Sequence, residues 1–274
     1  MMNIFDQMLA EYDIRTSGQR RNAMHEVMQE ITLAGLYRSK FFDKAAFYGG
    51  TCLRIFHKLP RFSEDMDFSL LRKDYTFDLQ KYLPAIIKEF KAAGRDVVIS
   101  RKEKKSNTKI ESAFLKDNTD IYDISFKTEK DVKIKIEVDT EPPLNFSTEQ
   151  KLSLMPFSFM TRCFTLPDLY AGKVHALLFR KWRNRVKGRD WYDFEWYVKH
   201  NTPLNFKHLQ TRAKDFNGME ISKETFAEML KDRLSSTNIK LVKQDIAPFI
   251  QNPKDLEIWS NDYFLQLADR ITYL

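Results

Sequence analysis

Two neighbouring segments decide the fold: Gly49-Gly50-Thr51 and, after a short amphipathic run, Arg61-Phe62-Ser63-Glu64-Asp65-Met66-Asp67-Phe68. In a β-strand, side chains two residues apart project from the same face, so Asp65 and Asp67 would lie about 7 Å apart with Met66 and Phe68 turned into a core. Mg²⁺ and the related Mn²⁺ prefer oxygen ligands and usually complete their coordination with water and substrate phosphates. The acidic strand therefore predicts a metal site formed by Asp65 and Asp67.

The glycines before this strand predict a site for a nucleoside triphosphate. Glycine lets backbone N–H groups approach a phosphate closely, and a helix beginning at Thr51 would direct its positive end at that phosphate. The hydroxyl of Ser63, two residues before Asp65, would lie on the metal side of the strand. We expect a nucleotide-binding segment made of five residues: Gly49, Gly50, Thr51, Arg54 and Ser63.

A second acidic strand is predicted from Lys133 to Thr140. Its apolar residues alternate with polar ones, which places Glu137 and Asp139 together on the face opposite the core. Either acid could be the third metal ligand. The longer side chain favours Glu137, whereas exposure at the strand end, just before Pro142, favours Asp139, and the sequence does not separate them.

The second half of the chain carries clustered basic residues. Lys173 and Arg180 are seven residues apart and share a helical face. Lys187 belongs to a run of basic residues between Arg180 and Arg189 that contains no acidic residue. Such charge suits a triphosphate or an RNA backbone, because phosphate contacts give affinity without sequence recognition. Asp190 and Asp193 follow three residues apart on a predicted helix, where at least one of them is expected only to cap the helix.

These motifs occur in an order that resembles the AbiEii/AbiGii toxin family, a branch of the polymerase-β-like nucleotidyltransferases. The resemblance covers most of the chain and is carried by these segments: Tyr48-Gly49-Gly50-Thr51-x-Leu53-Arg54, Arg61-x-Ser63-x-Asp65-x-Asp67-Phe68, Ile136-Glu137-Val138-Asp139, Lys173-x-His175-Ala176-Leu177 and Arg185-x-Lys187-x-x-Asp190. By this resemblance Asp190 belongs to the active site together with Lys173.

The resemblance implies an α+β fold. It predicts a nucleotidyltransferase domain over residues 1–150, with N-terminal helices and a mixed or antiparallel sheet flanked by helices, and a helical domain over residues 151–274 that completes the active site. Periodicity predicts helices within 3–43 and at 79–93 and a helical pattern from Thr165 onward, with further helices at 190–199, 206–216, 223–235, 240–250 and 260–272. Strands are expected near 97–99, 110–114, 121–126 and 133–140, as a short antiparallel meander.

The resemblance also implies a function. Such a protein would be the toxin of a bacterial toxin–antitoxin or phage-defence (abortive infection) system, transferring a nucleotide from a nucleoside triphosphate to an acceptor such as the 3′ end of tRNA and so halting translation. Its expected partners are an RNA acceptor and a cognate antitoxin, a winged-helix protein. Two alternatives remain: a non-catalytic protein that binds RNA or a partner on the same fold, and a nucleotidyltransferase acting on a small molecule.

Composition is compatible with this assignment and excludes other classes. The 274 residues are 43% apolar and 14% aromatic, which predicts a packed globular protein, and Lys and Arg exceed Asp and Glu by 45 to 38. The only cysteines, Cys52 and Cys163, form no CxxC pair, so we expect a cytoplasmic protein without a zinc or disulfide framework. No apolar run approaches the roughly 18 residues of a membrane span, so no membrane partner is expected.

Overall fold

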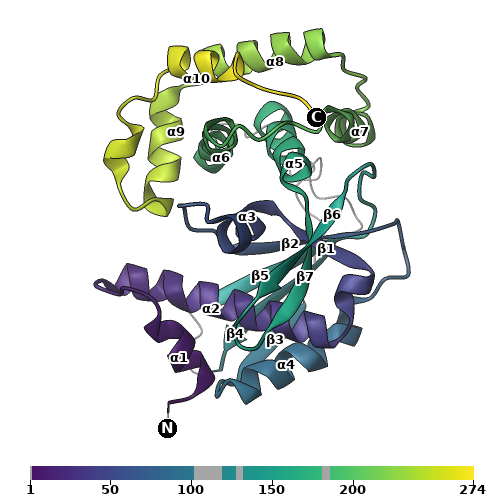
Figure 1. Cartoon of the computed structure of the whole chain (residues 1–274), viewed down its shortest axis with the longest axis vertical. Helices are drawn as coiled ribbons and strands as arrows, with labels where there is room; N and C mark the ends of the chain where they lie inside the picture. The colour runs from purple at the N-terminus through teal and green to yellow at the C-terminus, as the bar shows by residue number, and fades with distance from the viewer. Residues whose placement is uncertain (1, 102–118, 128–131, 181–185) are drawn as a thin grey trace. The chain divides into compact units, whose positions relative to one another are not determined.

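A computed structural model describes residues 2–101, 119–127, 132–180 and 186–274. Contacts within the chain divide it into two units, each of which is described by itself (Figure 1). Unit 1 comprises Met1–Lys58, Ser63–Pro142 and Thr148–Cys163, and unit 2 comprises Leu59–Phe62, Pro143–Ser147 and Phe164–Leu274. The domain boundary placed after residue 150 from the sequence falls inside a strand of unit 1.

Unit 1 is built on a seven-stranded mixed sheet with the order β3-β4-β5-β2-β1-β7-β6. Its strands are β1 (Ala45–Tyr48), β2 (Asp65–Leu70), β3 (Val97–Arg101), β4 (Thr119–Phe126), β5 (Lys133–Asp139), β6 (Thr148–Ser153) and β7 (Phe159–Phe164). The strands β3, β4 and β5 form the predicted antiparallel meander. The strand expected near 110–114 lies outside the described residues, and β6 and β7 were not anticipated from the sequence.

The central strands of the sheet position the acidic residues. Strand β2 pairs parallel with β5 on one side and antiparallel with β1 on the other. Parallel pairing of β2 with β5 brings together two acidic segments that are far apart in the sequence. The mixed sheet flanked by helices is the α+β architecture predicted above.

Helices of unit 1 cover the sheet and enclose its core: α1 (Ile4–Ala10), α2 (Ser17–Arg38), α3 (Gly49–His57) and α4 (Leu83–Ala92). Figure 1 shows α2 as a long helix beside α1 and α4. Gly35 allows the close contact of α2 with α4, because a Cβ at this position would lie 2.6 Å from Cα of Ile86. Helix α4 is preceded by a 3₁₀ turn, Leu79–Tyr82, and the chain leaves it through Gly94 at φ +85°, a conformation that favours glycine after a helix.

Unit 2 is helical, as predicted, with α5 (Leu166–Phe179), α6 (Gly188–Lys199), α7 (Phe206–Asn217), α8 (Lys223–Ser236), α9 (Ile239–Ile246) and α10 (Asn261–Ala268). Its core contains the aromatic side chains of α6, including Trp191 and Tyr197, which are 1% and 0% exposed. These rings therefore pack in the core and do not form a surface for stacking on a base. Among the described residues, no helix has the length and apolar character needed to cross a membrane.

Candidate functional site

The acidic strand β2 alternates between the core and the surface of unit 1. Met66 and Phe68 are fully buried, whereas Asp65 and Asp67 are partly exposed on the opposite face. The two carboxylates thus share one face of a central strand, as the two-residue period predicts. Backbone pairing on both sides of β2 fixes their separation and direction.

The register of β2 with β5 distinguishes the two candidates for the third acid. Glu137 is the direct neighbour of Asp67, whereas Asp139 lies beside Ser69, further along the strand. In addition, Oδ1 of Asp139 accepts a hydrogen bond of 3.0 Å from the backbone N–H of Glu141, which stabilises the turn after β5. The geometry favours Glu137 as the partner of the two aspartates.

Gly49 lies against the carboxylate of Asp67. A Cβ at this position would collide with Oδ2 of Asp67, and Gly49 has φ +81°, which L side chains rarely adopt. Helix α3 begins at Gly49 rather than at Thr51, and Tyr48 gives it no side-chain cap. The double-glycine motif therefore brings the N-terminus of α3 next to the acidic strand, with Gly50 buried in its first turn.

Thr51 and Ser63 have structural partners. The Thr51 side chain is fully buried; its hydroxyl donates to the backbone carbonyl of Asp65, and its oxygen is 3.0 Å from the hydroxyl oxygen of Ser63. The Gln29 side-chain amide, also fully buried, donates at 3.0 Å to the carbonyls of Ser63 and Glu64. These hydrogen bonds hold α2, α3 and the start of β2 together, and nothing in the sequence pattern singled out Gln29.

Arg54 pairs with an acid of α2. Its Nε lies 2.9 Å from Oε1 of Glu26, and its side chain is 24% exposed. Glu30, one turn further along α2, has its pKa raised to about 7 by burial and by the charge of Glu26. Arg54 therefore joins α3 to α2 and offsets part of the negative charge of this buried cluster.

Lys135 lies among the carboxylates of unit 1. It is the register neighbour of Asp65, and its ammonium forms an ion pair with Glu137. Burial alone would lower the pKa of Lys135, but the charges of Glu137, Asp65 and Asp67 outweigh it and raise the pKa. Across the part of the chain that the structure describes, no three His, Cys, Asp or Glu side chains are gathered as a metal site would need.

Unit 2 contains a buried ion-pair network centred on Asp193 of α6. The guanidinium of Arg61 binds both carboxylate oxygens of Asp193 at 2.6 Å, and the side chains are 1% and 0% exposed. The ammonium of Lys173, from α5, lies 2.7 Å from the same carboxylate. Burial would raise the pKa of Asp193, but Arg61 and Lys173 outweigh it and lower the pKa to about 2.

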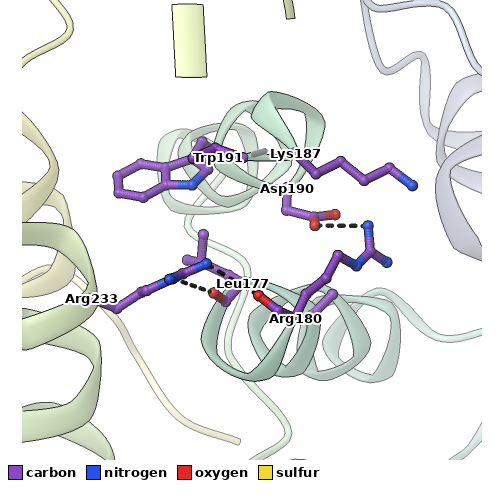
Figure 2. A pocket seen from close by; sticks show the side chains of 8 residues that line it. Leu177, Arg180, Lys187, Asp190, Trp191 and Arg233 are labelled. Atoms are coloured by element: carbon purple, nitrogen blue, oxygen red, sulfur yellow. Dashed lines mark hydrogen bonds and ion pairs between the residues drawn. The ribbon is translucent and has the colours of Figure 1, made fainter. Parts of the chain in front are cut away.

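Asp190, one turn before Asp193, extends this network through ion pairs with Arg180 and Lys173. Its carboxylate lies 3.1 Å from Arg180 and 4.0 Å from Lys173. Figure 2 shows Arg180, Lys187 and Asp190 around a small pocket that Arg233 of α8 also lines. Burial, followed by the charge of Arg180, lowers the pKa of Lys187 to about 8. This pocket therefore concentrates positive charge that an anion would stabilise.

The structure thus brings the predicted residues together in two groups. Asp65, Asp67 and Glu137 share a face in unit 1, beside the glycines of α3, whereas the basic residues and Asp190 gather in unit 2. The roles of Arg61, Asp193 and Arg233 were not apparent from the sequence. Two sequence signals were available: Arg61 lies in the motif Arg61-x-Ser63-x-Asp65, and Asp193 shares a helix face with Asp190. No sequence signal pointed to Arg233. Lys181, Arg183 and Arg185 of the basic run lie outside the described residues.

The fold is that of nucleotidyltransferase toxins. The structure is similar to that of MenT4, a nucleotidyltransferase toxin from Mycobacterium tuberculosis H37Rv, with a TM-score of 0.59 and 13% identity over 97% of this chain and 87% of that one. Two Helicobacter pylori structures also match. One is a putative nucleotidyltransferase, with a TM-score of 0.48 and 19% identity over 89% of this chain and 92% of that one. The other is JHP933, with a TM-score of 0.46 and 18% identity over 91% of this chain and 86% of that one.

Residues 31–269 match the family model described as the nucleotidyl transferase AbiEii toxin of type IV toxin–antitoxin systems. The chain belongs to this family, as its motifs indicated, and family membership implies an antitoxin partner. A search of curated protein sequences gives no match.

Proposed function

We propose that this protein transfers a nucleotide from a nucleoside triphosphate to the 3′ end of an RNA, with tRNA as the acceptor and Mg²⁺ as the cofactor. The observation that carries the proposal is the parallel register of β2 and β5, which puts Glu137 beside Asp67 on the face that also holds Asp65. Such a set recruits divalent ions in phosphoryl transfer.

The donor chemistry of this face suits a divalent metal ion, and an ion bound there would draw together carboxylates that the described residues do not gather into a three-ligand set. Asp65, Asp67 and Glu137 provide only oxygen donors, which suit Mg²⁺ and Mn²⁺, and backbone pairing holds them on adjacent strands. When bound, the ion would activate the attacking hydroxyl and stabilise the leaving pyrophosphate. The start of α3 supports a phosphate site, because Gly49 presents uncapped backbone N–H groups beside Asp67.

The cations of unit 2 suit the polyanionic substrates of such a reaction. Lys173, Arg180 and Lys187 balance the negative charge of the triphosphate and of the RNA backbone. Asp193 and Asp190 are positioning residues, since their carboxylates hold Lys173 and Arg180 in place. The lowered pKa of Lys187 supports this role, because a phosphate placed beside it would relieve repulsion from Arg180.

The family supports a toxic outcome, and the chemistry of the acceptor supplies a route to it. A tRNA must have a free, correct 3′ end to accept an amino acid, so nucleotides added there would stop protein synthesis. The net charge of +7 supports a polyanionic acceptor. The winged-helix antitoxin expected from the resemblance would act on this toxin or on its promoter.

Incubation with labelled nucleotides tests the proposal. The purified protein is mixed with Mg²⁺, total tRNA and each α-labelled nucleoside triphosphate in turn, beside an Asp65→Asn/Asp67→Asn variant. Asp96→Asn is the matched control, because this acid also belongs to unit 1 but its side chain is 66% exposed. We expect label in tRNA with the wild type and with Asp96→Asn, and none with the double variant.

Other outcomes would redirect the assignment. Label on protein instead of RNA would refute the RNA acceptor while retaining nucleotidyl transfer. Equal labelling by the wild type and the double variant would refute the role of the aspartates. Tight RNA binding without any labelling would favour a non-catalytic RNA-binding protein. Label on a small molecule would favour a nucleotidyltransferase that acts on small molecules.

A further inference from the structure

We propose that Lys135 is a built-in cation of the acidic face, which neutralises the carboxylates before a divalent ion binds and then competes with that ion for Glu137. This inference rests on the proposed function, because it concerns the same face of unit 1. It assigns to Lys135 a role in setting metal affinity. Neither the family resemblance nor the sequence pattern gave this residue a role.

The register of the sheet surrounds Lys135 with acids. Across the backbone its neighbours are Asp65 on β2 and Asp123 on β4, and directly paired residues project from the same face. Along β5 the next residue on this face is Glu137, itself the neighbour of Asp67. Lys135 is therefore bordered by carboxylates on both adjacent strands and on its own strand.

Side-chain contacts place the ammonium on these acids rather than in solvent. Lys135 forms an ion pair with Glu137, and the side chains are 29% and 20% exposed. The charges of Asp65 and Asp67 act on the same ammonium. An extended lysine on an isolated strand would instead keep its head in water.

A divalent ion and this ammonium need the same carboxylate. An ion held by Asp65, Asp67 and Glu137 would draw on the same Glu137 carboxylate that pairs with the Lys135 ammonium in the metal-free protein. The positive charge that remains nearby would also repel the ion. With an effective dielectric constant of about 20, unit charges separated by about 7 Å interact strongly enough to change an affinity by at least tenfold.

Metal binding without nucleotide tests the proposal. Mn²⁺ affinity is measured by electron paramagnetic resonance and calorimetry for the wild type, Lys135→Met, Lys135→Arg and Lys133→Met. Lys133 is the matched control, because it lies on the same face of β5 but is exposed and pairs with Ser125. We expect Lys135→Met to bind Mn²⁺ at least tenfold more tightly than the wild type, and the other two variants to stay within about threefold.

Thermal unfolding gives a second, independent result. In EDTA, Lys135→Met should melt at a lower temperature than Lys133→Met, because its carboxylates repel one another. Saturating Mn²⁺ should reduce this difference. If the wild type binds Mn²⁺ and Lys135→Met binds it no more tightly, the proposed role of Lys135 is overturned, while the metal-dependent function is not. Absence of Mn²⁺ binding in the wild type and in Lys135→Met would overturn both this inference and the metal-dependent function.

Discussion

Removal of the Asp193 carboxylate should strongly destabilise unit 2. Asp193 is fully buried and binds Arg61 through both oxygens at 2.6 Å and Lys173 at 2.7 Å, while the Arg61 side chain is only 1% exposed. Asp193→Ala leaves this guanidinium buried without a counter-charge. Breaking one side of a buried ion pair costs about 3–5 kcal/mol, so we expect a loss of this size in the free energy of unfolding.

Tryptophan fluorescence during urea unfolding measures this loss in the relevant unit. Trp191, Trp196 and Trp259 belong to unit 2, so their emission follows its unfolding. Dividing the loss by a urea m-value of about 1–3 kcal/mol/M predicts a midpoint lower by at least about 1 M. The matched control is Glu220→Gln, which removes an exposed pair with Lys214 and should change stability by less than about 1 kcal/mol.

A double variant separates loss of charge balance from loss of packing. Replacing both partners, as in Arg61→Leu/Asp193→Leu, removes the uncompensated guanidinium and should be less destabilising than Asp193→Ala alone. The reasoning is refuted if Asp193→Ala unfolds at the same urea concentration as Glu220→Gln. It is also refuted if the double variant loses as much stability as the two single changes added together.

Three further predictions concern conformation and protonation. Gly49→Ala should lower the stability of unit 1 by about 2 kcal/mol or more and displace Asp67, because Gly49 has φ +81° and an added Cβ would collide with the Asp67 carboxylate. Circular dichroism melting measures this loss against the control Gly18→Ala, which lies at an open position. Equal melting temperatures of the two variants would contradict the prediction. Burial lowers the pKa of His175 and of His208 to about 3, so between pH 7 and 5 only the unfolded chain gains these protons, and the stability of unit 2 should fall by about 2 kcal/mol per histidine. A pH-independent urea midpoint over that range would contradict this. Burial lowers the pKa of Lys187 to about 8, so binding of a nucleoside triphosphate should take up protons near this pH and should weaken between pH 7 and 9. Calorimetry in buffers of different ionisation enthalpy measures this proton uptake. If Lys187→Arg showed the same pH dependence, Lys187 would not be its source.

The sequence predicted elements whose signal is local. The period of two along Asp65–Phe68 predicted which side chains leave the core, and the helices of unit 2 followed from apolar periodicity. The motifs, in their order, predicted the family and hence the α+β fold. Strand β6 was missed because it is a polar edge strand, whose sequence lacks the apolar alternation of a half-buried strand.

The candidate site depended on pairings that local patterns do not contain. The choice between Glu137 and Asp139 required the register of β5 against β2, which is set by long-range backbone hydrogen bonds. The pairing of Arg61 with Asp193 joins residues 132 positions apart, and Asp193 alone has the appearance of an ordinary acid near a helix start. Thr51 and Arg54 could be assigned to the nucleotide segment, but their contacts with Asp65 and Glu26 required coordinates.

The central claim is that the acids of β2 and β5 bind the catalytic metal ion. Crystals grown with Mn²⁺ and a non-hydrolysable nucleoside triphosphate test it most directly through the anomalous scattering of manganese. The account predicts an anomalous peak coordinated by carboxylate oxygens of Asp65 and Asp67, with Glu137 rather than Asp139 as the third acid. A manganese peak bound to other residues, with no density beside these two aspartates, would contradict it.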